Sequence, residues 1–324
     1  MLRTFLISLS STVAITAANA APNVVVSIKP IHSLTAGVMK GVGEPELLLD
    51  GATSPHDFNL KPSQAQSIQD ADTIIWIGEG LESFLIKPME NQGDPKKSME
   101  LMDVKEVSLL DYREHEDHDD HEKHEEHDED KHEDEHAEHK DEESHDGHNH
   151  AEGGKDPHIW LDIDNAKTIT SAIAETLSKS DPENASTYAS NAAEMMQKLD
   201  ALDMQLTATL KGSQDKEYVV FHDAYQYFEN HFGLSKPLSI TLNPEVQPSA
   251  ARVKEIQEEV SEHKISCMFS EPQFSPKVLS VVAENTSATI STIDPLGSLI
   301  EKGEDHYFKM MSDLATNLSN CLKK

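Results

Sequence analysis

The chain has 324 residues and a formal net charge of −32, because 59 acidic residues outnumber 27 lysines and arginines. Such an excess of negative charge repels nucleic acids and anionic membrane surfaces and attracts cations. The composition therefore argues against a nucleic-acid partner, and the length favours two domains over one.

The first twenty residues have the features of a secretory signal peptide. Arg3 supplies a positive charge, residues 5–17 are apolar or small, and Ala18-Asn19-Ala20 fits a small-x-small cleavage site. The apolar run is too short for a transmembrane anchor, and no stop-transfer charges follow it. We therefore expect residues 1–20 to be cleaved and the chain to be exported from Ala21 onwards.

Residues 21–181 alternate strand-like and helix-like stretches, which predicts a first βαβ lobe. Short apolar runs of this kind are typical of buried parallel strands. The expected strands are residues 23–28, 45–49, 73–77 and 99–104. The expected helices are residues 32–39, 63–69, 81–89 and 164–178.

A highly charged segment interrupts this lobe at residues 113–155. Between Arg113 and His150 it holds 19 acids, four basic residues and eleven of the 18 histidines. Nothing in this composition can form a packed core, so we expect a disordered loop. Its histidines are His115, His118, His121, His124, His127, His132, His136, His139, His145, His148 and His150.

The spacing of these histidines limits what the loop can do. The five from His115 to His127 recur at every third residue, so on a helix they would spiral around the axis. His132 and His136 match the H-E-x-x-H motif of metalloproteases, but chance explains such a match where histidine and glutamate are this common. We interpret the loop as a weak, accessory collector of metal ions; a solvated charge run with incidental metal affinity is the alternative.

A long helix is expected at residues 182–211, between the two lobes. Asp181 and Pro182 supply a cap and a first-turn proline. Apolar residues then recur at spacings of three and four, as on one buried face of a helix. They are Ala192, Met195, Leu199, Leu202, Leu206 and Leu210.

Residues 212–324 repeat the strand–helix alternation and predict a second lobe. The expected strands are residues 218–221, 238–241, 265–269 and 288–293. The expected helices are residues 249–263, 275–284 and 307–322. The fold class is therefore α/β, with two βαβ lobes that have parallel sheets and are joined by one long backbone helix.

Four metal-binding side chains stand where predicted strands end or where order resumes after the acidic segment. They occur in GATSPHD, DPHIW, YVVFHD and ISTIDP, and they are His56, His158, His222 and Asp294. Ligands of open parallel sheets bind beyond the carboxyl ends of the strands. Two of these residues come from each lobe, which predicts a metal cleft between the lobes. Three imidazoles and a carboxylate suit a tetrahedral ion, above all Zn²⁺.

Other polar residues near the predicted strand ends have smaller expected roles. Asp223 and Glu271 are candidates to orient the ligand imidazoles through hydrogen bonds. We interpret His231 and His263 as structural or surface residues; a secondary surface site is the alternative for His231, which follows a helical segment. We interpret His32 and His306 as structural residues.

The chain contains two cysteines, Cys267 and Cys321. In an exported protein such a pair is first interpreted as a disulfide. A thiolate metal site is the alternative, although it would favour closer spacing, as in CxxC.

An ordered set of motifs resembles one known family over essentially the whole mature chain. The motifs are SIKPIHSL, GATSPHDF, LKPSQ, the acidic His-rich insert, HIWLD, VVFHDAYQYFENHFGL, NPEVQPSAARVKEI, SCMFSEPQF and DPLG. In this order they are similar to the periplasmic zinc-binding proteins of zinc ABC uptake systems, the ZnuA type. These belong to the metal-binding cluster of solute-binding proteins.

The resemblance implies a set of roles for particular residues. It implies that His56, His158 and His222 bind zinc, and that Asp294 occupies the family's fourth, variable ligand position. Manganese-binding relatives carry glutamate in place of His222, which favours zinc. Some zinc-binding members carry glutamate immediately before the first ligand. Pro55 stands there in this chain, which leaves Asp294 or a water as the fourth ligand.

The resemblance also implies a Cys267–Cys321 disulfide and a function. The expected protein is a periplasmic monomer, not an enzyme, that binds Zn²⁺ with high affinity and delivers it to the membrane permease of an ABC transporter. An exported zinc-dependent hydrolase and an extracellular metal buffer are the alternatives.

Overall fold

The structure, a computed structural model, describes residues 21–113 and 154–323. Two four-stranded sheets form the two lobes, with strand orders β2-β1-β3-β4 and β6-β5-β7-β8, and all neighbouring strands run parallel. The strands are β1 (Val24–Val26), β2 (Glu46–Leu47), β3 (Thr73–Trp76), β4 (Ser98–Glu100), β5 (Val219–His222), β6 (Leu238–Thr241), β7 (Cys267–Ser270) and β8 (Thr289–Thr292). The predicted α/β fold of two parallel lobes is confirmed.

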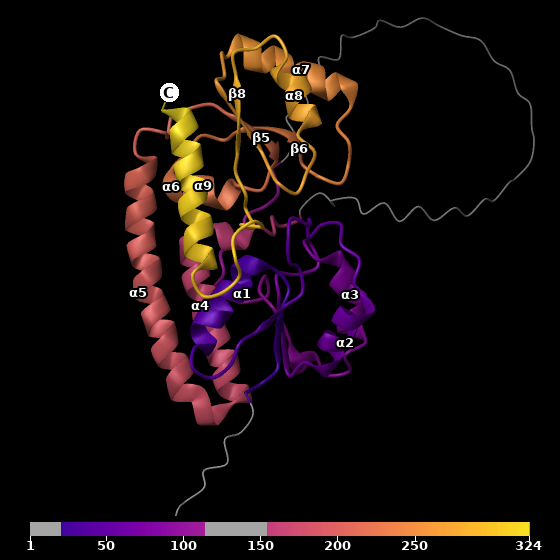
Figure 1. The fold of residues 1–324 in the computed structure, drawn as a ribbon, viewed down its shortest axis with the longest axis vertical. Coiled ribbons are helices and arrows are strands. Elements are labelled where there is room, and N and C mark those ends of the chain that lie inside the picture. The colour runs from indigo at the N-terminus through magenta and orange to yellow at the C-terminus, as the bar shows by residue number, and fades with distance from the viewer. Residues whose placement is uncertain (1–20, 114–153, 324) are drawn as a thin grey trace, which may run out of the picture.

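Helices cover both sheets and connect the lobes (Figure 1). The helices are α1 (Lys29–Met39), α2 (Pro62–Asp70), α3 (Ser83–Glu90), α4 (Ile163–Ser180), α5 (Ala185–Leu210), α6 (Gln226–Phe232), α7 (Ala250–Glu262), α8 (Lys277–Ala283) and α9 (His306–Leu322). Single 3₁₀ turns occur at Pro95–Lys97, Ile159–Leu161 and Pro182–Asn184.

The long helix predicted between the lobes is α5. Its 26 residues correspond to about 39 Å at 1.5 Å per residue, and it runs along one side of both lobes (Figure 1). It starts at Ala185 instead of residue 182, because Pro182–Asn184 form a 3₁₀ turn. The predicted apolar face is buried, which explains how so long a helix is held against both lobes.

The strand predicted at residues 99–104 is shorter than expected. The amide of Leu101 still bonds to the carbonyl of Trp76 in β3, and that of Met102 bonds to Ile77 just after β3. The amides of Asp103 and Val104 instead bond back to Glu100 and Leu101. The chain therefore turns away from the sheet after Met102.

The C-terminal helix α9 returns to the first lobe and packs against α1 and α5. Cys321 near its end forms a disulfide with Cys267 at the start of β7, with the Cα atoms 5.8 Å apart. The disulfide prediction is confirmed, and it fixes α9 to the second sheet.

Buried hydrogen bonds also join the lobes along the loop that precedes α9. The ammonium group of Lys29, at the start of α1, donates to the carbonyls of Ser298 at 2.8 Å and Ile300 at 3.1 Å. The indole of Trp160 donates to the carbonyl of Pro295 at 2.8 Å. These contacts hold the residues on either side of the cleft close together.

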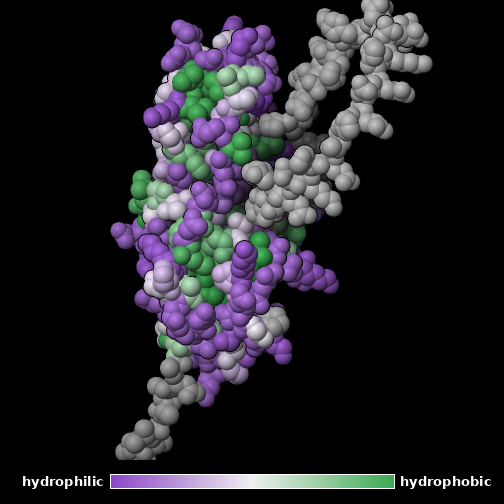
Figure 2. Space-filling model, turned by 90° about the vertical axis from the view of Figure 1, so that its right-hand side faces the viewer, coloured by the Kyte–Doolittle hydropathy of each residue, from purple (hydrophilic) through white to green (hydrophobic). Residues whose placement is uncertain are grey.

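Hydrophilic residues predominate on the face shown in Figure 2, with hydrophobic residues in small groups over both lobes. Within the described residues, the structure contains no helix long and apolar enough to span a membrane. The domain limits 21–181, 182–211 and 212–324 and the signal peptide at residues 1–20 stay predictions.

Candidate metal centre

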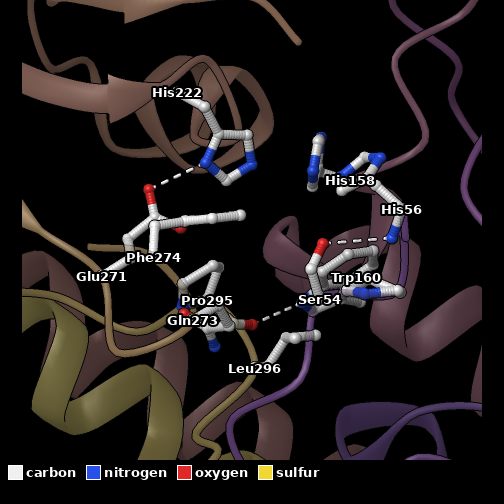
Figure 3. Close-up of a pocket in the computed structure, with 11 residues that line it drawn as sticks. Ser54, His56, His158, Trp160, His222, Glu271, Gln273, Phe274, Pro295 and Leu296 are labelled. Carbon is white, nitrogen blue, oxygen red and sulfur yellow. Dashed lines mark hydrogen bonds and ion pairs between the residues drawn. The ribbon is translucent and has the colours of Figure 1, made fainter. Parts of the chain in front are cut away.

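Three of the four predicted ligands lie together in the cleft. One ring nitrogen from each of His56, His158 and His222 can be chosen so that all three lie within 4.8 Å of one another. The ring centroids are 5.4 Å apart for His56–His158 and His158–His222, and 5.8 Å apart for His56–His222. Figure 3 shows the three imidazoles facing a common space. Such spacing allows all three to contact one ion.

Each of these histidines is positioned by a different local structure. His222 is the last residue of β5, so its side chain stands at the carboxyl end of the second sheet. His158 immediately precedes the 3₁₀ turn Ile159–Leu161. His56 lies in the loop after β2, where its amide donates to the hydroxyl of Ser54 at 3.2 Å. His56 is partly exposed whereas the other two are buried, so solvent reaches the cluster from the side of His56.

Two buried carboxylates orient two of the imidazoles. The Nδ1 of His158 lies 2.7 Å from Asp156 Oδ1, and the Nδ1 of His222 lies 2.8 Å from Glu271 Oε1. A neutral imidazole that donates Nδ1–H to a carboxylate keeps Nε2 free as a metal ligand and becomes more basic. Nε2 of His222 is buried without a hydrogen-bond partner, as expected of an atom that faces an ion.

The sequence identifies Glu271 as an orienting residue but not Asp156. The signal for Asp156 is the DPH tripeptide, in which the carboxylate also accepts the backbone N–H of His158 at 3.0 Å. Aspartate commonly bonds to the backbone two residues further along, and the same geometry here places it beside the imidazole. Asp223, the other predicted orienting residue, instead forms an ion pair with Arg113 at 2.8 Å. Burial raises the pKa of Asp223, and Arg113 opposes that rise.

Apolar side chains enclose the imidazoles. The pocket has a volume of about 10 Å³, far below the roughly 300–1,000 Å³ of pockets for organic ligands. Its walls include Trp160, Phe274 and Leu296, and the rings of Trp160 and Phe274 lie 5.4 and 5.5 Å from those of His158 and His222. Such walls lower the local dielectric and limit access of water, and the pocket fits a single ion better than an organic substrate.

Asp294 is not part of the three-histidine group. Its carboxylate accepts hydrogen bonds from Gln273 Nε2 at 2.7 Å, from the amide of Leu296 at 3.0 Å, and from both the amide and the hydroxyl of Ser298 at 2.6 Å. These bonds shape the loop that supplies Pro295 and Leu296 to the pocket wall. The role of Asp294 as a zinc ligand stays a prediction.

The other histidines considered in the sequence lie partly inside and partly outside the described part of the chain. The eleven loop histidines from His115 to His150 lie outside the described residues. His32 and His306 bond to the carbonyls of Pro45 and Gly297, each at 3.0 Å, as expected of structural residues. Burial lowers the pKa of His32 to about 4.

Comparison with known proteins identifies the chain's relatives. The family model described as zinc-uptake complex component A, periplasmic (ZnuA), matches residues 24–321. The chain belongs to the ZnuA family. This confirms the resemblance seen in the sequence, and the family serves zinc uptake, not catalysis.

Individual relatives cover nearly the same range. The high-affinity zinc uptake system protein ZnuA of Brucella suis is 44% identical over 306 residues, which are 93% of this chain and 92% of the relative. The protein of the same name from Yersinia pestis is 38% identical over 300 residues, which cover 93% of this chain and 91% of the relative. A crystal structure of ZnuA superposes with a TM-score of 0.73 at 21% identity, over 93% of this chain and 99% of that one.

A second group of potential ligands lies outside the cleft, where His231 of α6 meets α4 and α5. Asp162, Asp164 and His231 offer atoms within 4.8 Å of one another. Nδ1 of His231 lies 3.4 Å from Asp162, and Nε2 lies 3.1 Å from Asp203. Both ring nitrogens therefore face carboxylates, which is the arrangement of a protonated histidine in an ion pair. The bonds to Asp162 and Asp203 raise the pKa of His231 from 6.5 to about 9.

This ion pair predicts a pH-dependent contribution to stability. The folded-state pKa of about 9 exceeds the unfolded value, so the contribution is complete below pH 6.5 and disappears as the pH rises through 9. We expect His231→Gln to lower the free energy of unfolding by about 1–2 kcal/mol at pH 6, after allowance for solvent screening, and by much less at pH 9.5. Urea unfolding followed by circular dichroism measures both values. Equal losses at the two pH values would contradict the assignment.

Proposed function

We propose that His56, His158 and His222 bind the transported Zn²⁺ and that the protein delivers the ion to the membrane permease of an ABC importer. The observation that supports this assignment is the convergence of three imidazoles from both lobes on one small pocket. Two of them donate Nδ1–H to buried carboxylates and can present Nε2 to the ion. Either Asp294 or a water completes a tetrahedral shell.

The donor set favours zinc over harder cations. Imidazole nitrogen suits Zn²⁺, whereas Mg²⁺, Ca²⁺ and Mn²⁺ prefer carboxylate, carbonyl and water oxygens. Each imidazole must lose its proton to coordinate, so zinc affinity falls in acid. The two carboxylates fix the tautomer that presents Nε2 of His158 and His222 to the ion.

The expected cellular setting is the periplasm. The family description carries that location, and the expected cleavage after Ala20 would export the chain. The partner is the permease of the uptake system, and we expect the carrier to act as a monomer. The two lobes, joined by α5 and by α9, are expected to tilt modestly on loading.

A catalytic zinc site is the strongest competing function, since three histidines with an open position also describe a zinc hydrolase. The pocket volume of about 10 Å³ leaves no room for a peptide or an ester beside the ion. Membership in an uptake family also argues against hydrolysis. The remaining alternative, a metal buffer that acts through the His-rich loop, predicts that the loop carries most of the zinc capacity.

Deletion of residues 115–150 separates the carrier from the buffer. We expect the shortened protein to bind one zinc ion with wild-type affinity, because the three ligands and their two carboxylates all lie outside the deletion. The binding of further, weaker ions should disappear. Titration calorimetry with a competing chelator measures both the stoichiometry and the affinity.

The opposite result would favour the buffer. If the shortened protein loses the tightly bound zinc ion as well as the weakly bound ions, the assignment of the tight site to the cleft is wrong. A neighbouring structure is described as a ZnuA deletion mutant with zinc bound, at a TM-score of 0.72 and 21% identity over 93% of this chain and 98% of that one. A protein of this fold thus retains bound zinc after a deletion.

A further inference from the structure

The two chain segments that flank the His-rich loop form a short antiparallel stem. The amide of Tyr112 donates to the carbonyl of Gly154 at 3.0 Å, and the amide of Asp156 donates to the carbonyl of Leu110 at 2.9 Å. A β-bridge joins Asp111 to Lys155 between them. The stem, residues 110–112 and 154–156, thus places Asp156, which orients His158, on one of its strands.

The stem belongs to the first lobe by sequence but is bound to α6 of the second. The hydroxyl of Tyr227 accepts the amide N–H of Leu110 at 2.9 Å and donates to the carbonyl of Asp156 at 2.8 Å. The side chain of Gln226 donates to the carbonyl of Asp111 at 3.2 Å. One tyrosine therefore bridges both strands of the stem.

Arg113, which follows the stem directly, adds a buried ionic contact between the lobes. Its guanidinium donates through Nη1 to Asp223 at 2.8 Å and through Nη2 to Glu229 of α6. The exposed fractions of the three side chains are 13%, 9% and 1%. Asp223 immediately follows the ligand His222. Arginine suits this position because its planar fork can bond two carboxylates at once.

These contacts connect two metal ligands through one element. One strand of the stem holds His158 through Asp156, and Arg113 holds the residue next to His222. We infer that the stem and Arg113 form an inter-lobe clasp that sets the separation of His158 and His222, with Arg113 as a positioning residue for zinc binding. The inference rests on the proposed function, because it describes how the same zinc site is assembled.

Removal of Arg113 should affect the ligands and not only the fold. Without the guanidinium, the buried carboxylates of Asp223 and Glu229 repel each other, and the end of β5 loses its link to the first lobe. His222 would then lose its fixed place opposite His158. Loss of an orienting partner typically weakens metal affinity by about 10- to 100-fold.

The test compares zinc affinities of full-length variants by competition with a chromophoric chelator. We expect Arg113→Gln to bind zinc about 10- to 100-fold more weakly. Its Co²⁺ complex should show an altered visible spectrum, which reports ligand geometry. Arg113→Lys should recover part of the affinity, since an ammonium group can pair with one carboxylate at a time.

Lys40→Gln is the matched control. Lys40 also forms an ion pair with a residue near α9, Glu304, at 3.0 Å, but that pair is exposed and does not contact the ligands. Its removal should leave zinc affinity and the Co²⁺ spectrum unchanged. If the wild-type protein itself fails to bind zinc, the proposed function is wrong; if it binds zinc and Arg113→Gln matches it in affinity and spectrum, only the clasp is wrong.

If Arg113→Gln does not fold, a second variant tests the role of Arg113 in zinc binding. The double variant Arg113→Gln, Glu229→Gln removes both partners of the most buried pair and so leaves no lone charge at Glu229. It should fold by circular dichroism and still bind zinc more weakly than wild type, because Asp223 has lost its anchor. Wild-type affinity in this folded double variant would overturn the inference.

Discussion

Replacement of His222 by alanine should weaken zinc binding by about 100- to 1,000-fold while the chain stays folded. Tight protein zinc sites bind with about 10–16 kcal/mol, so one of four ligands accounts for roughly 2.5–4 kcal/mol, or two to three powers of ten. His222 ends β5, and its ring contacts the pocket, so its removal leaves the strand pairing intact. Titration calorimetry with a competing chelator measures the loss.

His263→Ala is the matched control for this variant. His263 is an exposed histidine of the same lobe, and its Nδ1 lies 3.2 Å from Glu217, away from the cleft. Zinc affinity should not change in this control. If His222→Ala binds one zinc ion as tightly as wild type, the three-histidine site is not the zinc site, whatever the loop binds.

Part of the three-histidine group could be predicted from the sequence because parallel strands obey a simple rule. Side chains at the carboxyl ends of neighbouring parallel strands meet at one edge of the sheet. His222 ends an apolar run, so its place at that edge follows from the pattern alone. The positions of His56 and His158 depend on loops, and for them the resemblance to a known family added the information that the pattern lacks.

The parts that could not be predicted depend on contacts between residues distant in sequence. Arg113 bonds to Asp223 and Glu229, which lie 110 and 116 positions away, and no local pattern connects them. Asp294 also ends a strand-like run, as predicted, but its carboxylate is taken up by hydrogen bonds within its own loop and to Gln273. Strand-end position therefore identifies candidate ligands, but it does not reveal the hydrogen bonds that each candidate also makes.

The Cys267–Cys321 disulfide should be the largest single covalent contribution to stability. Its cysteines are 54 residues apart, and closing a loop of that length stabilises the folded state by about 4 kcal/mol in the chain-entropy model. We expect the double variant Cys267→Ala, Cys321→Ala to lower the free energy of unfolding by about this amount. Urea unfolding measures the loss, and reduction of the wild-type protein should reproduce it.

Zinc affinity should respond much less than stability to the loss of this disulfide. Cys267 begins β7, whereas Glu271, which orients His222, follows the opposite end of the same strand. The two parallel neighbours of β7, which are β5 and β8, still hold that end in register. We therefore expect the folded double variant to bind zinc within a few-fold of wild type. A zinc affinity that falls as far as in His222→Ala would mean that α9 and its disulfide help to place the ligands themselves, beyond stabilising the lobe that carries His222.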